Sequence, residues 1–346
     1  MKIVCDDKIP FIRPAVEQLA DEAVFKAGRD ITAADVRDAD ILLVRTRTRC
    51  DSQLLQGSRV QLVVTATIGY DHLDTRWMEE HAIQWSNCPG CNATSVGQYV
   101  RNSLLALQQQ RPFRLADATV GVVGVGHVGT AVVAALEAAG VKQLLLNDPP
   151  RQAAGETAPG GRHWCSLQQL QAEADVITFH TPLTQQGPFP TEHLADDAFF
   201  AALQHQPVII NAARGGVVDE EALLAAMQQG LVRDVIIDTW EHEPDVSRTL
   251  LERAFIATPH IAGYSADGKA NATRMTLARV CHFLGRPMDF TILPPSLPED
   301  FTPVTDPVQQ ALQLYDPRAD SSRLKAEPTA FERLRGDYPL RRESFN

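Results

Sequence analysis

The sequence lacks an apolar run long enough to cross a lipid bilayer. Runs such as residues 41–44 and 144–146 are far shorter than the roughly 20 residues that a membrane-spanning helix needs. It also lacks a secretory leader, because Asp6 and Asp7 interrupt the first apolar stretch at once. Residues 2–5 therefore predict a buried strand, and the cytoplasm is the expected compartment.

Positive charge is also scarce. The chain carries 32 Lys and Arg against 43 Asp and Glu, which gives a formal net charge of −11. Proteins that bind nucleic acid or anionic membranes usually present a basic face, so this balance argues against both partners. An anionic substrate is compatible with it, because a few clustered arginines hold a carboxylate or phosphate within an acidic protein.

Cysteine is too sparse and too scattered for a disulfide framework. The chain has six cysteines in 346 residues, a usage that indicates reduced thiols. Cys88 and Cys91 form a C-x-x-C at a Pro-Gly turn, but neither a second ligand pair nor a thioredoxin-like pattern accompanies them. Incidental spacing is the better interpretation, and we expect no metal site.

What the sequence does contain is two successive α/β patterns, and its length favours two or three domains. Nearly continuous apolar segments at residues 2–5, 41–44, 60–65 and 83–86 predict strands buried on both faces, as in a parallel sheet. Residues 14–20 and 74–81 predict helices between them. This first part resembles a small flavodoxin-like α/β unit.

The second α/β pattern follows a long amphipathic helix, which carries an apolar face from Val96 to Leu107 and should end before Pro112. A strand at 120–123 leads through a glycine-rich turn into a helix at 128–139, and a helix is also predicted at 220–229. Further strands are expected at 143–147, 176–179, 208–211, 235–238 and 254–257. The predicted fold class is α/β, with a Rossmann-type doubly wound parallel sheet in this part.

The glycine-rich turn reads Gly124-Val125-Gly126-His127-Val128-Gly129, a G-x-G-x-x-G between a predicted strand and a predicted helix. The glycines permit a tight turn, close approach of a pyrophosphate and close packing of helix on strand. The helix N-terminus supplies free N–H donors to the phosphates. Asp148 ends the next strand, where a carboxylate binds the adenosine ribose and repels a 2′-phosphate, so the motif predicts NAD as cofactor.

Three polar groups follow three successive predicted strands. Arg214 comes after the strand at 208–211, Glu243 after the strand at 235–238 and His260 after the strand at 254–257. Because ligands of open α/β sheets bind at the carboxyl ends of the strands, the three side chains should reach the same edge. Each residue alone is more often structural, but the three are chemically complementary.

Oxidation of a 2-hydroxy acid needs a carboxylate clamp, a base and a hydride acceptor. Arg214 can hold a carboxylate bidentately and orient C2. His260 is the natural general base, since imidazole titrates near neutral pH. Glu243 can orient the imidazole and favour its protonated form. The sequence therefore predicts an NAD-dependent 2-hydroxyacid dehydrogenase.

The order of these motifs resembles the D-isomer-specific 2-hydroxyacid dehydrogenase family over residues 1–285. The resemblance implies that Arg214, Glu243 and His260 are catalytic. It also places the His180-Thr181-Pro182-Leu183 segment beside the cofactor and Asp238 near the nicotinamide. The expected cofactor-binding residues are Gly124, Gly126, His127, Val128, Gly129, Asp148, Thr181, Ala212, Ala213, Asp238 and Gly263.

Several segments are shared with one narrower group of that family, among them Val44-Arg45-Thr46, residues 65–72 and His260-Ile261-Ala262-Gly263-Tyr264. This closer resemblance implies a small, phosphorylated 2-hydroxy acid as substrate, with contacts at Thr46, Thr67 and Tyr264. It also implies a homodimer formed through a C-terminal module. The proline-rich residues 287–328 and the basic residues 331–342 fit such a module, although disorder is the alternative.

The expected domains are a substrate domain of residues 1–93 and 259–285, an NAD-binding domain of residues 94–258 and a dimerisation module of residues 286–346.

Candidate ligands of the substrate phosphate are Arg45, Arg47, Arg341 and Arg342, each of which is otherwise a solvated surface charge. Two alternatives for the function stay open. One is another enzyme of the family, such as a phosphoglycerate dehydrogenase or a hydroxypyruvate reductase, and the other is a non-catalytic NAD-sensing protein resembling a corepressor.

Overall fold

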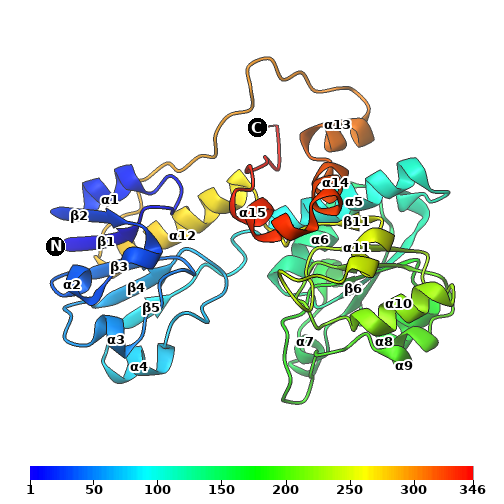
Figure 1. Cartoon of the computed structure of the whole chain (residues 1–346), viewed down its shortest axis with the longest axis horizontal. Coiled ribbons are helices and arrows are strands. Elements are labelled where there is room, and N and C mark those ends of the chain that lie inside the picture. Colours follow the sequence, from blue (N-terminus) through cyan, green and yellow to red (C-terminus); the bar gives the residue numbers. More distant parts are fainter. Residues whose placement is uncertain (346) are drawn as a thin grey trace. The chain divides into compact units, whose positions relative to one another are not determined.

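The structure, a computed structural model, describes residues 1–345 and divides into two compact units (Figure 1). The first unit contains residues 1–92 and 265–296, and the second contains residues 93–264 and 297–346. The chain thus returns to the first unit after Tyr264, a few residues later than the sequence indicates. The expected C-terminal module is divided, since residues 286–296 cluster with the first unit and the rest with the second.

The first unit is built on a five-stranded parallel sheet with the order β2-β1-β3-β4-β5. This is the flavodoxin-like order, so the sequence prediction for this part is confirmed. The strands are β1 (Lys2–Asp6), β2 (Glu22–Lys26), β3 (Ile41–Val44), β4 (Leu62–Thr65) and β5 (Gln84–Ser86). The helices are α1 (Arg13–Leu19), α2 (Ala33–Val36), α3 (Ser52–Leu55), α4 (Thr75–Glu80) and α12 (Ala266–Phe283).

Helices lie on both sides of this sheet (Figure 1), and alternate residues of its central strands pack into two different apolar clusters. Ile41 and Leu43 pack with residues of α1 and α12, whereas Leu42 and Val44 pack with residues of α2, α3 and α4. Both faces of β3 are therefore buried. This explains why its four residues are all apolar rather than alternating with polar ones.

The second unit contains a six-stranded parallel sheet with the order β11-β10-β9-β8-β6-β7. An isolated parallel bridge between Leu146 and Trp164 extends it beyond β7, which gives the doubly wound Rossmann arrangement. The strands are β6 (Thr119–Val123), β7 (Gln143–Asn147), β8 (Val176–Phe179), β9 (Val208–Asn211), β10 (Asp234–Ile237) and β11 (Ile256–Ala257). The α/β fold class and the Rossmann-type sheet are confirmed.

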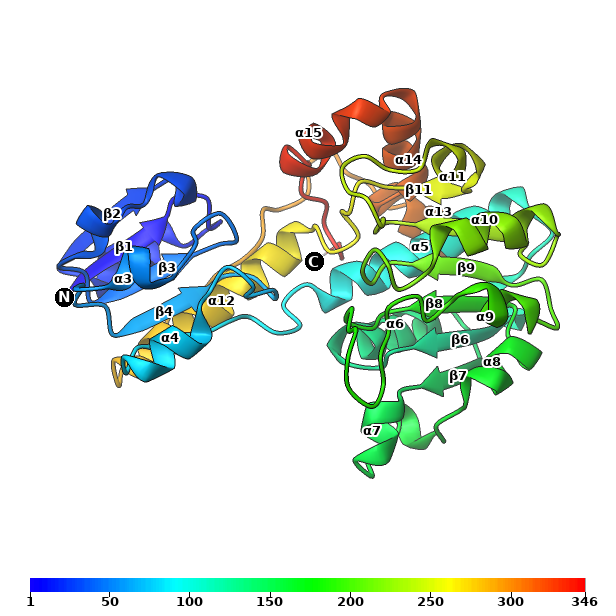
Figure 2. The same cartoon turned by 60° about the horizontal axis from the view of Figure 1, so that its bottom comes forward.

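Helices cover both faces of this second sheet (Figure 2). One face packs against α5 (Ala93–Gln110) and α6 (His127–Ala138), and the other against α8 (Leu167–Glu173), α9 (Asp197–Ala201), α10 (Glu220–Gln228) and α11 (Arg248–Arg253). The short helix α7 (Pro149–Ala153) follows β7. None of the helices within residues 1–345 combines the length and apolar character of a membrane span.

The C-terminal residues of the second unit form three short helices, α13 (Pro307–Leu314), α14 (Pro317–Ala326) and α15 (Phe331–Gly336). They are anchored in the core on both faces of the sheet. Leu312 joins the apolar cluster of α5 and α6, whereas Leu324 and Phe331 join the cluster on the other face. Phe331 is only 1% exposed. The described part of this tail is therefore packed rather than disordered.

All six cysteines are buried and unpaired. Burial raises the pKa of Cys88 to about 11 and that of Cys91 to about 12, so both thiols are protonated and unreactive. Within the described residues, no three His, Cys, Asp or Glu side chains are arranged to hold a metal ion.

Candidate active site

Three loops at the carboxyl edge of the second sheet carry the residues expected from the sequence. Residues 212–216 follow β9, residues 238–243 follow β10 and residues 258–263 follow β11. Asn211 joins the first two loops, because its side-chain amide donates to the carbonyls of Arg214 at 3.1 Å and Thr239 at 3.3 Å. A Cβ on Gly215 would lie 1.8 Å from the Trp240 carbonyl oxygen, so only glycine permits this approach.

His260 and Glu243 form a close pair. Nδ1 of His260 lies 3.0 Å from Oε1 and 2.9 Å from Oε2 of Glu243. Because an ionised carboxylate only accepts hydrogen bonds, Nδ1 carries the proton in this pair and donates it. In the neutral imidazole Nε2 then bears the lone pair, and within residues 1–345 it has no hydrogen-bond partner. The arrangement presents Nε2 as a proton acceptor.

The backbone at His260 adopts a left-handed conformation with φ of 56°, which is uncommon for a residue other than glycine. Asp238 holds the loop in this shape by accepting hydrogen bonds from it. Its backbone carbonyl accepts from the His260 N–H at 2.9 Å. Its carboxylate accepts from the N–H groups of Ile261 at 2.8 Å and Ala262 at 2.9 Å, and from the Thr258 hydroxyl at 2.6 Å. Both carboxylate oxygens of Asp238 are thus engaged in shaping the histidine loop.

Glu243 is held ionised by its neighbours. Burial alone would raise the pKa of this carboxyl, yet the pKa lies below its usual value. The hydrogen bond and charge of His260 lower it, as do the Trp240 N–H at 3.1 Å and the nearby Arg335. Asp238 behaves differently, since burial dominates and raises its pKa. The carboxylate that faces the imidazole is therefore held in its charged form by the groups around it.

Arg214 is exposed at the same edge of the sheet. Its Nη1 donates to the Ala213 carbonyl at 2.8 Å, which orients the guanidinium. No ion pair is found for Arg214 within the part of the chain that the structure describes. Its side chain forms no hydrogen bond or ion pair with Glu243 or His260, so the structure brings the three predicted residues to one edge but pairs only two of them.

The glycine-rich turn has the backbone that its sequence predicts. Gly124 has φ of 82°, and a Cβ there would lie 2.8 Å from the Thr181 backbone nitrogen. A Cβ on Gly129 would lie 2.1 Å from the Gly124 carbonyl oxygen, whereas Gly126 faces open space. Gly126 is the N-cap of α6, and no side chain caps the helix. The turn therefore leaves room and helix N–H donors for a phosphate.

Asp148 closes this turn from the neighbouring strand. Its Oδ2 accepts from the Val125 N–H at 2.8 Å and its Oδ1 from the Arg151 N–H at 3.1 Å. Next to the turn, Thr181 Oγ1 is buried without a hydrogen-bond partner among the described residues. A buried hydroxyl that lacks a partner beside an open glycine turn fits a site whose ligand supplies that partner. The residues present therefore fit a dinucleotide.

His180, which precedes Thr181, is partly buried and neutral. Burial lowers the pKa of His180 to about 3. Its Nε2 is 2.8 Å from the Thr178 hydroxyl. This histidine is therefore unsuited to exchange protons near neutral pH, and His260 is the better candidate for the base.

Residues 92–262 match the family described as D-isomer specific 2-hydroxyacid dehydrogenase, NAD binding domain. The erythronate-4-phosphate dehydrogenase of Bacteroides fragilis strain YCH46 is 49% identical over 343 residues, which cover 99% of this chain and 97% of that protein. The enzyme of the same name from Edwardsiella ictaluri is 44% identical and covers 99% of this chain and 93% of its own length. The chain belongs to the D-isomer specific 2-hydroxyacid dehydrogenase family.

Solved structures of this family share the fold. A D-lactate dehydrogenase from Aquifex aeolicus, solved with NAD and lactic acid, superposes with a TM-score of 0.61 at 22% identity and covers 82% of this chain and 96% of its own. The family match coincides with most of the second unit, where the glycine-rich turn lies. NAD is therefore the cofactor of this dehydrogenase, and it supplies the hydride acceptor when bound.

Removal of the Asp148 charge should weaken the preference of this dehydrogenase for NAD. The variant Asp148→Asn keeps one acceptor oxygen but loses the charge that disfavours a 2′-phosphate, so the NAD-to-NADP ratio of kcat/KM should fall about tenfold or more. Steady-state rates with each dinucleotide would measure it. Asp175→Asn, the same change in a residue that binds Thr119 N–H at the start of β6, is the control. An unchanged ratio in Asp148→Asn would contradict the assignment.

The remaining predicted substrate residues lie in different units of this dehydrogenase. Thr46 and Thr67 follow β3 and β4 of the first unit, and the Thr67 hydroxyl donates to the Gly69 carbonyl at 2.9 Å. Tyr264 belongs to the second unit, where its ring meets that of Tyr338 edge-on at 6.1 Å.

Among the predicted phosphate ligands, Arg341 has another role. Its side chain is buried and donates to the carbonyls of residues that follow His260, at 3.0 Å to Ile261, 2.6 Å to Ala262 and 2.7 Å to Tyr264. It is neither a solvated charge nor a group with free donors for a phosphate. No sequence pattern signals this contact, because nearly 80 residues separate Arg341 from the loop it binds.

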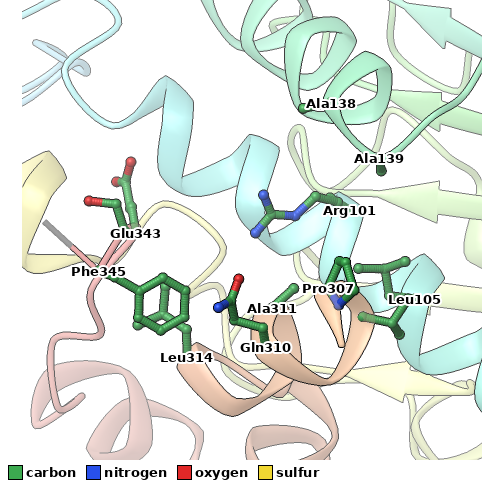
Figure 3. Close-up of a pocket in the computed structure, with 12 residues that line it drawn as sticks. Arg101, Leu105, Ala138, Ala139, Pro307, Gln310, Ala311, Leu314, Glu343 and Phe345 are labelled. Carbon is green, nitrogen blue, oxygen red and sulfur yellow. The ribbon is translucent and has the colours of Figure 1, made fainter. Parts of the chain in front are cut away.

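A pocket of about 470 Å³ lies elsewhere in the second unit, among α5, α6, α13 and residues 343–345 (Figure 3). Arg101, Leu105 and Leu314 are among its lining residues. None of the predicted catalytic or cofactor residues lines this pocket, so it is separate from the chemistry described above.

Proposed function

We propose that this dehydrogenase oxidises 4-phospho-D-erythronate at C2 and produces 2-oxo-3-hydroxy-4-phosphobutanoate, a step of pyridoxal phosphate biosynthesis. The observation that carries the proposal is identity of 40–49% to enzymes of that name over 99% of the chain. The His260–Glu243 pair supplies the proton chemistry that the reaction needs.

Each residue has a defined task in the proposed reaction. Arg214 binds the substrate carboxylate with its planar guanidinium and fixes the orientation of C2. Nε2 of His260 accepts the proton of the C2 hydroxyl, while Glu243 holds Nδ1–H and stabilises the imidazolium that forms. Asp238 keeps the loop that presents Nε2 in its left-handed shape.

The remaining substrate contacts follow from the resemblance. Thr46, Thr67 and Tyr264 offer hydroxyl groups to the hydroxyls or phosphate of the substrate. Arg45 and Arg47 stay candidates for the phosphate. Nε of Arg45 lies 3.3 Å from the buried carboxylate of Asp6, which holds the guanidinium beside the end of β3.

A rate assay tests this function. Purified protein with NAD and 4-phosphoerythronate should generate the absorbance of reduced nicotinamide, in single turnover or with a 2-oxo acid present to recycle tightly bound cofactor. Parallel reactions with 3-phosphoglycerate and glycerate serve as the substrate controls. We expect a kcat/KM for 4-phosphoerythronate at least about a hundredfold above the others, since a specific anionic site discriminates by this much.

Two other outcomes would overturn the proposal in different ways. Turnover of another acid alone would keep the roles of Arg214, Glu243 and His260 but replace the substrate with that of a phosphoglycerate dehydrogenase or a hydroxypyruvate reductase. Bound NAD without turnover of any acid would favour a non-catalytic NAD sensor. The intact pair of His260 and Glu243 argues against a sensor, because a protein that only binds NAD needs no proton acceptor.

We also propose a cytoplasmic homodimer. In the proposed division of labour, the first compact unit binds the substrate, residues 93–264 bind NAD, and the C-terminal helices from residue 297 on form the dimerisation module. Support comes from the resemblance, and the helices α13, α14 and α15 are the packed elements of the chain that would form the module. Sedimentation of the full chain at several concentrations would measure the mass, and a monomer at every concentration would contradict the dimer.

A further inference from the structure

The carboxylate of Glu243 is shared between His260 and an arginine from the C-terminal tail. Oε2 of Glu243 lies 2.9 Å from Nδ1 of His260 and 3.4 Å from Nη1 of Arg335. Sequence reasoning missed this arginine, because residue 335 is 92 positions away along the chain. Arg335 has no direct contact with the imidazole in the described structure, so its influence on His260 passes through the carboxylate.

The fold delivers Arg335 to this position rather than leaving it on a loose tail. Phe331, at the start of α15, is buried in the core, and Leu334 packs partly buried against the same cluster. Beyond the helix, Arg341 is fixed by the carbonyls of residues 261, 262 and 264. Arg335 therefore lies on a helix that is anchored on both sides, and its own side chain is 30% exposed.

We propose that Arg335 is a positioning residue, which holds the Glu243 carboxylate against His260 and sets the pH at which the histidine exchanges its proton. The proposal rests on the dehydrogenase chemistry given above and adds a residue to it. Arg335 does not touch the reacting atoms. Its positive charge offsets part of the negative charge of the carboxylate. Glu243 can therefore orient the imidazole without holding it permanently protonated.

The charges around the imidazole determine the direction of the effect. Glu243 and the buried Asp238 both favour protonated His260, and Glu220 adds negative charge near Glu243. Arg335 is the arginine that contacts Glu243 in this cluster, and its positive charge opposes protonation of His260. Oxidation of the substrate requires neutral His260 as the base. Loss of the Arg335 charge should therefore move the acidic limb of the oxidation profile to higher pH.

Two features of the structure support a charge effect of measurable size. The pKa of Glu243 lies below its usual value although burial raises it, and Arg335 is among the groups that lower it. The carboxylate that connects the two cations is also largely screened from solvent, with 18% of its side chain exposed. A unit charge that is separated from a titratable group by one intervening side chain shifts the pH midpoint of that group by roughly half a unit to one unit in such surroundings.

The test compares kcat/KM for oxidation against pH in three variants of the full-length protein. Arg335→Met removes the charge and keeps the apolar stem, and Arg335→Lys keeps the charge. Arg333→Met is the matched control, because Arg333 lies on the same helix but pairs with Glu327 at 2.6 Å. The midpoint of the acidic limb should rise by about half a unit to one unit in Arg335→Met, and by much less in the other two variants.

A second readout does not depend on turnover. The ring of His260, followed by NMR in the NAD-bound protein, should also titrate at higher pH in Arg335→Met. If the wild type oxidised none of the acids, the proposed function would fail while this titration still tested Arg335. Activity that falls equally at all pH values, with both midpoints unmoved, would overturn the proposal. So would a rise in KM for phosphorylated acids alone, which would make Arg335 a substrate ligand.

Discussion

Replacement of His260 by alanine should reduce kcat for oxidation by about a thousandfold and leave NAD binding intact. A positioned general base contributes typically 10²- to 10⁴-fold, and no neighbouring group replaces it here. Burial of its imidazole lowers the pKa of His180 to about 3, and both oxygens of Asp238 are engaged by the loop. Stopped-flow or steady-state rates with 4-phosphoerythronate, together with fluorescence titration of NAD, would measure both parts of the prediction.

The matched control is His205→Ala, which removes an exposed imidazole that lies 3.9 Å from Asp175. This variant should keep the wild-type rate, so that loss in His260→Ala cannot be attributed to removal of any histidine. Alanine also has to adopt the left-handed backbone of residue 260, so His260→Asn is a second variant that tolerates this conformation better. Near wild-type turnover in both position-260 variants would show that another group accepts the proton.

The parallel sheets were predictable because their strands are buried on both faces. Residues 41–44 and 208–211 are nearly continuous apolar runs, and both are central strands with helices on each side. The edge strand β2 was not predictable in this way. Its sequence, Glu-Ala-Val-Phe-Lys, is only partly buried and begins and ends with a charge, so the pattern of a buried strand is absent.

Helix α12 was missed for a different reason. Its Ser265 N-cap accepts a hydrogen bond from the Gly268 N–H, but the first two turns contain glycine, alanine and asparagine rather than a strong apolar stripe. These small residues are buried in the first unit, where Ala270 is fully inaccessible. The helix is therefore stabilised by close packing of small residues. A prediction that relies on the periodicity of large apolar residues does not detect such a helix.

The active-site residues were predictable as a set but their pairing was not. The rule that parallel strands present ligand-binding groups at their carboxyl ends brought Arg214, Glu243 and His260 to one edge. The contacts made by Arg335 and Arg341 depend on how the C-terminal tail folds back over that edge. Nothing in a run of basic residues distinguishes an arginine bound to carbonyls from a solvated one, so these roles required the structure.

Replacement of Arg214 by methionine should lower kcat/KM for oxidation by roughly a hundredfold to a thousandfold, while NAD affinity stays within a few-fold. The exposed guanidinium has one donor on the Ala213 carbonyl and leaves others to form a bidentate pair with the substrate carboxylate. Loss of that pair removes both binding and the alignment of C2, which together cost this much. Arg214→Lys should recover only part of the rate, because an ammonium group keeps the charge but not the planar fork.

The contrast with Arg233→Met tests whether the position or the charge matters. Arg233 is exposed and immediately precedes β10, at the amino end of the strand whose carboxyl end leads to Glu243. Its loss changes the net charge of the protein by the same amount and should leave kcat/KM unchanged. An equal decrease in both variants would indicate general electrostatic attraction of the anionic substrate. A decrease confined to position 214, larger for methionine than for lysine, is the result expected of a carboxylate clamp.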